Sequence, residues 1–146
     1  MPTDKKDMEN LTKLGAKSKP ERKLEAFPNH SPGRYYLVTL KSEEFTCLCP
    51  KTGQPDFAKI NIYYVPDKKI LESKSFKLYL WSYRNEGIFH EHMINQILDE
   101  IVNIIDPHFC IVKGVFNVRG GIGINVNAEH VKTREAKDIW IRLLSV

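Results

Sequence analysis

Apolar residues recur along this chain with two different periods, and each period predicts a different kind of element. Residues 34–40 and 57–65 are rich in β-branched and aromatic side chains, and Ile60 and Ile62 alternate with polar positions. Such alternation is typical of a strand with one buried face. A shorter apolar piece, residues 45–49, follows a loop after the first of these segments. The N-terminal half therefore predicts two main strands.

The next two segments have helical spacing. Residues 73–84 carry apolar side chains three and four positions apart, and Asn85, Glu86 and Gly87 stop that pattern. Residues 89–105 carry a wider apolar stripe, which predicts a helix packed on a core. Two further strands are predicted at residues 109–117 and 122–127, around a tight turn at Gly120 and Gly121.

The order strand, strand, helix, helix, strand, strand favours an α+β fold. Short connections within each strand pair favour antiparallel pairing. We predict an antiparallel sheet with two antiparallel helices on one face. Residues 129–146 fit a short helix or a strand. Residues 1–25 are polar and charged and predict a flexible basic tail, which leaves residues 26–146 as a single domain.

Composition narrows the function classes. The 146 residues carry a formal net charge of +4, and much of the positive charge lies in the first 25 residues. Because that segment lacks aromatic residues, we favour a solvated tail over direct nucleic-acid binding. No apolar run is long enough for a membrane helix, and the N-terminus lacks the apolar core of a secretory signal. These features predict a cytoplasmic protein with no membrane partner.

The three cysteines cannot all form disulfides with one another, and Cys49 has the most informative surroundings. Pro50 breaks the predicted strand directly after Cys49, and Lys51 could favour the thiolate. Asp56 follows on the far side of a Pro/Gly turn, so a nucleophile and a proton donor could meet there. Asp56 could equally cap a turn. We interpret Cys47 and Cys110 as packing residues.

Two other groups of residues have both a structural and a functional interpretation. Glu91 could complement the dipole of the second helix, or accept paired N–H bonds from a guanine-like edge, with His90 orienting the ring. Lys74, Lys77 and Arg119 could be solvated, or could bind the phosphates of a nucleotide cofactor.

A metal site is an alternative use of the cysteines. Cys47 and Cys49 with His90 and His92 have the ligand types of a zinc site. However, side chains two apart on a helix point in different directions, so the two histidines would not share one metal ion. The metal alternative is therefore the weaker one.

Four short motifs together resemble one known family, the NADPH-dependent 7-cyano-7-deazaguanine reductases, which are the nitrile reductases of queuosine biosynthesis. The resemblance covers residues 24–127, which is most of the chain, and it implies the tunnelling fold shared with GTP cyclohydrolase I. The residues that carry it are Leu24-Glu25-Ala26-Phe27-Pro28-Asn29, Cys49-Pro50-Lys51-Thr52-Gly53-Gln54-Pro55-Asp56-Phe57, Glu72-Ser73-Lys74-Ser75 and Phe89-His90-Glu91.

The resemblance implies roles for particular residues, which we state as expectations. It also implies a homo-oligomer with sites at subunit interfaces, a small-molecule 7-deazapurine substrate and no metal. The alternatives are a zinc-dependent pterin or GTP cyclohydrolase-like enzyme and a non-catalytic purine-binding protein. The expected residues are Cys49 and Asp56 for catalysis; Glu91, His90, Phe89, Glu72 and Ser73 for substrate; and Ser73, Lys74, Lys77, Arg119 and Gly120 for NADPH.

Overall fold

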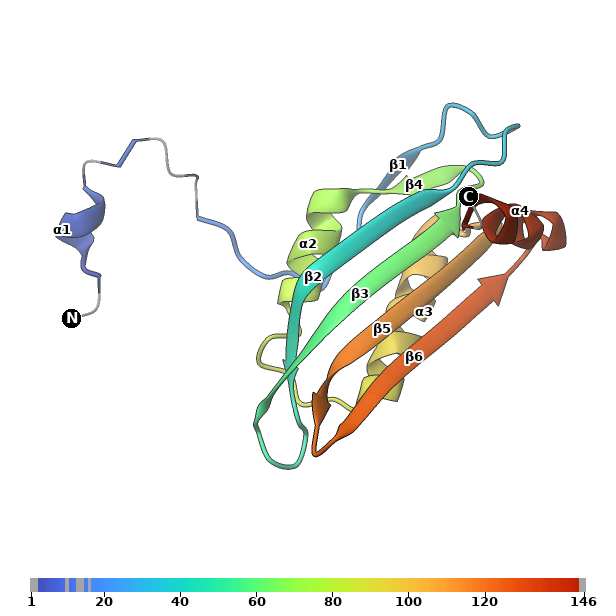
Figure 1. Cartoon of the computed structure of the whole chain (residues 1–146). Helices are drawn as coiled ribbons and strands as arrows, with labels where there is room; N and C mark the ends of the chain where they lie inside the picture. The colour runs from blue at the N-terminus through green and yellow to red at the C-terminus, as the bar shows by residue number, and fades with distance from the viewer. Residues whose placement is uncertain (1–2, 10, 13–14, 16, 145–146) are drawn as a thin grey trace.

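A four-stranded antiparallel sheet forms the centre of the molecule (Figure 1). The computed structural model describes residues 3–9, 11–12, 15 and 17–144. The strand order in the sheet is β2-β3-β5-β6, so β2 and β6 are its two edges. This arrangement confirms the predicted α+β fold. The strands are β2 (Val38–Leu48), β3 (Pro55–Val65), β5 (Phe109–Arg119) and β6 (Ile122–Val131).

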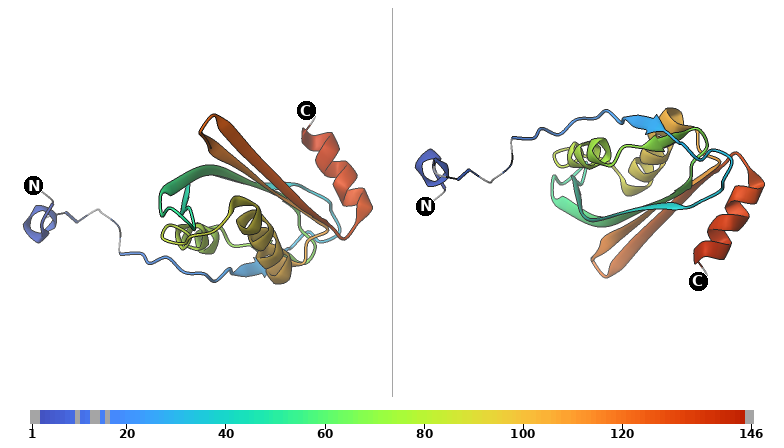
Figure 2. Two further views of the ribbon diagram at one scale, coloured as in Figure 1. Left: turned by 90° about the horizontal axis from the view of Figure 1, so that it is seen from below. Right: turned by 90° about the horizontal axis from the view of Figure 1, so that it is seen from above.

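Two helices, α2 (Ser73–Trp81) and α3 (His90–Ile105), cover one face of this sheet, as predicted (Figure 2). Ile60 and Ile62 of β3 point to this face and are fully buried. They share one core with Ile97 of α3 and with the buried Tyr79 of α2. The alternation in β3 and the stripe in α3 meet in this core, because each would otherwise leave apolar surface in water.

A third helix, α4 (Arg134–Leu144), packs on the opposite face of the sheet (Figure 2). Trp140 lies against Tyr63 of β3, with 4.5 Å between the ring centroids, and beside Phe109. The sequence left residues 129–146 open between helix and strand. The structure uses both, because β6 runs to Val131 before α4 begins. The prediction that helices cover one face of the sheet was therefore incomplete, because α4 packs on the other face.

The prediction of two separate pieces at residues 34–40 and 45–49 was wrong. One continuous strand, β2, runs from Val38 to Leu48. Its register with β3 shifts between Ser42 and Phe45, so three steps along β2 match two steps along β3. Such a β-bulge adds a residue and interrupts the alternation of buried and exposed positions. That interruption is why the segment reads as a loop in the sequence.

The chain joins the folded domain before residue 26. Arg22 donates a hydrogen bond from Nε to the hydroxyl of Ser82 and contacts Glu86, and Leu24 is buried in the main core. The short helix α1 (Lys5–Met8) buries no residue. Of the predicted basic tail, residues 1–2, 10, 13–14 and 16 lie outside the described part of the chain.

A small two-stranded sheet completes the fold. It pairs β1 (Ala26–Pro28) with β4 (Lys69–Leu71), and the sequence pattern predicted neither strand.

The bounds of the two predicted helices differ slightly from those observed. Helix α2 ends at Trp81, three residues earlier than predicted, and Phe89 is the residue before α3 rather than its first residue. Among the described residues, no helix combines the length and apolarity needed to cross a membrane.

Candidate active site

Cys49 lies directly after β2, in the connection to β3. Its backbone N–H donates to the carbonyl of Gln54 at 2.8 Å, and the N–H of Gly53 donates to the Cys49 carbonyl at 3.0 Å. Gly53 has a φ of 71°, which a glycine adopts without strain. Cys49 is only partly buried. The tight turn therefore fixes the backbone of Cys49 and leaves the thiol accessible.

The loop before α3 supports this turn from the other side. The N–H of Leu48 donates to the carbonyl of Glu86 at 2.9 Å, and the N–H of Ile88 donates to the carbonyl of Leu48 at 3.2 Å. Gly87 lies so close to Pro50 that an added Cβ would approach the Pro50 Cα to 3.0 Å. The start of α3 is therefore held beside Cys49 within one protomer.

Hydrogen bonds to the sulfur lower the pKa of the Cys49 thiol. The largest cause is the Thr52 hydroxyl, followed by the backbone N–H groups of Thr52 and Lys51. Burial has the opposite effect on the other two cysteines, because it raises the pKa of Cys47 to about 11 and that of Cys110 to about 12. Cys49 is therefore the cysteine suited to act as a nucleophile, and the other two pack in the core, as predicted.

We expect substitution of Thr52 by Val to raise the pH at which Cys49 reacts. A lowered pKa means that the thiolate forms at lower pH, so alkylation of the native protein should reach half its maximal rate below the pH of about 8.5 that is typical of a free cysteine. Loss of the Thr52 hydroxyl should move that midpoint upward. The measurement is the rate of iodoacetamide labelling against pH, with Thr39→Val on β2 as control. Identical midpoints in the two variants would contradict this role of Thr52.

Asp56 is the second residue of β3 and is buried, with 5% of its surface exposed. Its Oδ2 lies 3.2 Å from Nε2 of His90, and its Oδ1 accepts a hydrogen bond from Nη1 of Arg119. The ring of His90 stacks on Phe116, with 3.7 Å between centroids and 9° between planes. The structure thus connects the carboxylate to an oriented imidazole and a guanidinium.

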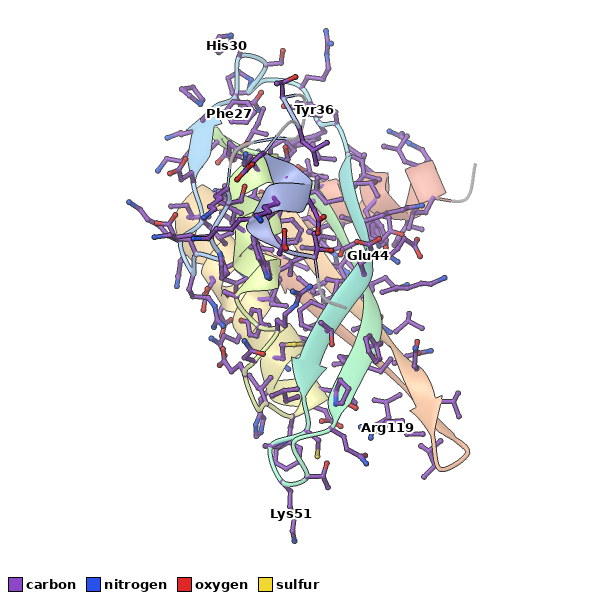
Figure 3. The ribbon with its side chains drawn as sticks, turned by 90° about the vertical axis from the view of Figure 1, so that its left-hand side faces the viewer. Phe27, His30, Tyr36, Glu44, Lys51 and Arg119 are labelled. Atoms are coloured by element: carbon purple, nitrogen blue, oxygen red, sulfur yellow. The ribbon has the colours of Figure 1, made fainter. Side chains whose placement is uncertain are left out.

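Arg119 was predicted to bind cofactor phosphate, and the structure places it beside the predicted proton donor. Besides Asp56, its guanidinium contacts the side-chain oxygen of Gln54, in the turn that carries Cys49. Figure 3 shows Arg119 at the same end of the molecule as Lys51, which marks the tip of this turn. Gly120 and Gly121 follow with positive φ values and form the turn into β6. Spacing along the sequence gave no signal for the contact between residues 56 and 119.

Phe89 and Glu91 flank His90, so they lie at the same end of the sheet as Cys49. Both are exposed. A site at a subunit interface, as the resemblance implies, could draw Cys49 and Glu91 from two different subunits. In the structure a single protomer brings their two segments together through Leu48, Gly87 and the Asp56–His90 pair.

The residues of α2 lie away from Cys49. Glu72 caps the helix, because its carboxylate accepts hydrogen bonds from the N–H groups of Lys74 and Ser75 at 2.7 and 2.6 Å, which lowers the Glu72 pKa. The far end of α2 leads to the loop that supports Leu48, so Glu72 and Ser73 lie about one helix length, roughly 13 Å, from that end. Within one protomer the structure does not bring Glu72, Ser73 or Lys74 to the thiol.

A groove of about 540 Å³ lies between β2 and α2. Ser73 and Lys77 line it, whereas Lys74 does not. Of the described residues, no three His, Cys, Asp or Glu side chains are grouped in a way that could hold a metal ion. The proposed zinc ligand Cys47 is fully buried in the core, so the ligand set of the metal alternative does not assemble.

The fold and the geometry of the site can now be compared with known proteins. The profile of a family described as QueF-like protein matches residues 55–135. A protein of Syntrophus aciditrophicus, named NADPH-dependent 7-cyano-7-deazaguanine reductase, is 59% identical over 130 residues, which cover 89% of this chain and 93% of that protein. A protein of the same name from Thermomicrobium roseum is 51% identical over 118 residues, or 81% of this chain and 92% of that protein.

A solved structure is also similar. The crystal structure of the archaeosine synthase QueF-Like in the apo form matches with a TM-score of 0.60 and 27% identity, over 64% of this chain and 91% of that chain. The antiparallel sheet with its layer of helices is a tunnelling fold. The accessible thiol at one end of this sheet is a reactive group of the kind that enzymes use. The chain belongs to the QueF-like family, whose curated members similar to it are named NADPH-dependent 7-cyano-7-deazaguanine reductases.

Proposed function

We propose that this protein is an NADPH-dependent oxidoreductase that reduces the nitrile of 7-cyano-7-deazaguanine to the primary amine, 7-aminomethyl-7-deazaguanine, in queuosine biosynthesis. The observation that carries the proposal is the accessible, pKa-lowered thiol of Cys49 at the same end of the sheet as the Asp56–His90 pair. A thiolate nucleophile close to a group that can transfer protons is the arrangement that covalent attack on a nitrile carbon needs.

The first step joins the substrate to the protein. The sulfur of Cys49 attacks the nitrile carbon and forms a C–S bond, while the nitrogen takes a proton from the Asp56–His90 pair, giving a covalent thioimide. NADPH supplies a hydride to this carbon in each of two reductions. Between them the C–S bond breaks, the sulfur leaves as thiolate and an imine remains. Two hydrides and two protons in total convert the nitrile to the amine.

Substrate recognition is assigned to the residues around the start of α3. The carboxylate of Glu91 can accept two N–H bonds from the guanine-like edge of the substrate. The exposed ring of Phe89 offers an apolar surface to the base, and His90 is held in one orientation by Phe116. We assign Glu72 and Ser73 to the substrate as well, and they would reach it from a neighbouring subunit.

Two of the residues assigned to NADPH, Ser73 and Lys77, suit a phosphorylated dinucleotide. Ser73 and Lys77 are exposed and line the groove beside β2, so a hydroxyl and an ammonium group are available for phosphate oxygens. Lys74 is exposed outside the groove. Arg119 and Gly120 are at the end of the molecule that holds Cys49, away from Ser73. Arg119 must release Asp56 to bind a phosphate.

The experiment that tests the function is a stoichiometric assay. Purified protein is mixed with the nitrile and NADPH, with one of the two reactants limiting. We expect the reaction to consume two NADPH for each amine formed. NADPH is followed by absorbance at the nicotinamide band, and the amine by mass spectrometry. Consumption of NADPH without amine, or amine formation without NADPH, would contradict the proposal.

We also assign this protein to a homo-oligomer with shared sites. Both edge strands, β2 and β6, are long, and unpaired edges of this kind are normally covered in stable proteins. Phe57, Val118 and Ile122 are at least half exposed at the end of the sheet that holds Cys49. Exposed apolar side chains grouped near a site are typical of an interface. A second copy that covers this end would also supply the missing Glu72 and Ser73.

We expect the mass in solution to be several times the 16.9 kDa of one chain. Light scattering coupled to size-exclusion chromatography measures it. If sites are shared, mixing inactive Cys49→Ala with inactive Lys77→Glu protein under subunit exchange should restore part of the activity, because some interfaces then combine an intact Cys49 with an intact Lys77. A fully active monomer, or a mixture that stays inactive after exchange, would contradict shared sites.

The location assigned to the reaction is the cytoplasm. All three cysteines are free, and a thiolate nucleophile has to stay reduced to act. We propose no direct contact with nucleic acid or membrane, since the substrate is a free base.

A further inference from the structure

The groove between β2 and α2 is lined by two further residues, Trp81 and Arg84, to which no role has been assigned. One face of α2 and its extension lines it with Lys77, Trp81 and Arg84, which are three and four residues apart and therefore neighbours on a helix. The bulged part of β2 forms the other wall. None of Cys49, Asp56, His90 and Arg119 lines the groove, so the groove is separate from the site around the Cys49 thiol.

The two walls present complementary groups. Phe45, Phe76 and Leu80 are buried and provide an apolar base, while Lys77 and Arg84 place two cations on the rim. On β2, Glu43 pairs with Lys59 at 3.3 Å, whereas Glu44 forms no ion pair with any of the described residues. Figure 3 shows Glu44 midway along β2. A mixed apolar and cationic groove with an unpaired carboxylate suits a nucleotide, whose ribose hydroxyls can donate to that carboxylate.

We propose that Trp81 and Arg84 are further binding residues for the NADPH that Lys77 binds in this groove; the proposal rests on the function assigned above. The partly exposed indole of Trp81 offers a face to a planar base, and the Arg84 guanidinium lies 5.9 Å from the centroid of that ring. An arginine beside an aromatic ring can stack on a base and also bind a phosphate. Lys77 and Arg84 are seven residues apart, or roughly 10 Å along a helix. This separation suits a ligand that carries phosphate at two places.

The capping of α2 makes these side chains necessary. The N–H groups of Lys74 and Ser75, which a phosphate could otherwise use, already donate to the carboxylate of Glu72. A phosphate in the groove must therefore be bound by side chains rather than by the helix terminus. Lys77 and Arg84 are the cations of α2 and its extension that line the groove.

A second copy of the chain is the competing occupant, since β2 is an edge of the sheet. The two occupants predict different results for the same variants. If NADPH binds here, Lys77→Gln and Arg84→Gln weaken NADPH binding and leave the mass in solution unchanged. If another subunit fills the groove, these variants lower the mass and leave the NADPH affinity of the remaining oligomer unchanged, which would overturn the proposal.

The first measurement is the quenching of tryptophan fluorescence by NADPH, because the chain has two tryptophans in different places. Trp81 lines the groove, while Trp140 is buried against Tyr63 on the opposite face of the sheet. We expect Trp81→Phe to remove most of the quenching and Trp140→Phe to keep it. Quenching that survives in Trp81→Phe and is lost in Trp140→Phe would overturn the proposal.

The second measurement is the dissociation constant of NADPH by calorimetry, which needs no turnover. Lys77→Gln and Arg84→Gln should each raise it about tenfold, the effect of losing a charge-assisted hydrogen bond. Lys69→Gln is the matched control, since Lys69 is an exposed lysine outside the groove. Equal effects of all three variants would overturn the proposal. Adduct formation between Cys49 and the nitrile, measured without NADPH, should be unchanged in each; its absence in the unmodified protein would instead count against the proposed function.

Discussion

Replacing Cys49 by Ala should abolish turnover, with a loss on the order of 10⁴-fold or more, as is typical when a covalent nucleophile is removed. The reason is specific to this site. Cys49 is the accessible thiol, and its pKa is lowered by the Thr52 hydroxyl, so no other cysteine can replace it. The measurement is the rate of NADPH oxidation with saturating nitrile, together with the melting temperature of the variant.

Cys47→Ala is the matched control for that variant. Cys47 lies two residues earlier, within β2, but is fully buried, and its pKa is raised to about 11. This variant should lose some stability through the small cavity it creates and should retain turnover. Comparable losses of turnover in the two variants would mean that the strand end, rather than the Cys49 sulfur, matters.

Substitution of Asp56 by Asn should lower turnover by about 10²- to 10³-fold, the usual contribution of a positioned proton donor. An amide keeps the shape of the side chain and a hydrogen bond to Arg119 or His90 is still available, but it cannot transfer a proton. We expect the rate of adduct formation at Cys49 to fall as well, because the nitrile nitrogen must be protonated as the C–S bond forms. The measurement is the single-turnover rate of adduct formation without NADPH.

Asp67→Asn provides a control with a similar set of contacts at the other end of the sheet. Asp67 also pairs with a histidine and a cation, since it lies 3.5 Å from Nε2 of His108 and 2.7 Å from Nζ of Lys132. Lys132 is the main cause of the lowered pKa of Asp67. Both Asn variants lose an ion pair, so similar losses of stability are expected. Only Asp56→Asn should lose activity, and a similar loss in Asp67→Asn would contradict a chemical role for Asp56.

The sequence predicted the main elements because their apolar patterns are regular. The alternation at Ile60 and Ile62 and the stripe that ends at Ile105 were sufficient to place β3 and α3. The bulge between Ser42 and Phe45 was not predictable in this way, since one extra residue breaks the period that identifies a strand. The three-residue strands β1 and β4 are too short for a period to be visible.

The site was only partly predictable for a similar reason. Cys49 and Asp56 are close in sequence, so a turn brings them to one end of the sheet. The contacts of Asp56 with His90 and Arg119 join segments 34 and 63 residues apart, and they depend on how β5 and α3 pack against β3. The groove between β2 and α2 likewise depends on packing, so Trp81 and Arg84 had no signal in the sequence.

The most direct test of the central claim is the intact mass of the protein after mixing with 7-cyano-7-deazaguanine in the absence of NADPH. We predict a gain equal to the whole mass of the nitrile, because addition of the thiol to the nitrile loses no atoms. Peptide mapping should place the added mass on Cys49, and addition of NADPH should remove it as the amine is released. An unchanged mass, or an adduct that remains in Cys49→Ala protein, would contradict covalent reduction at Cys49.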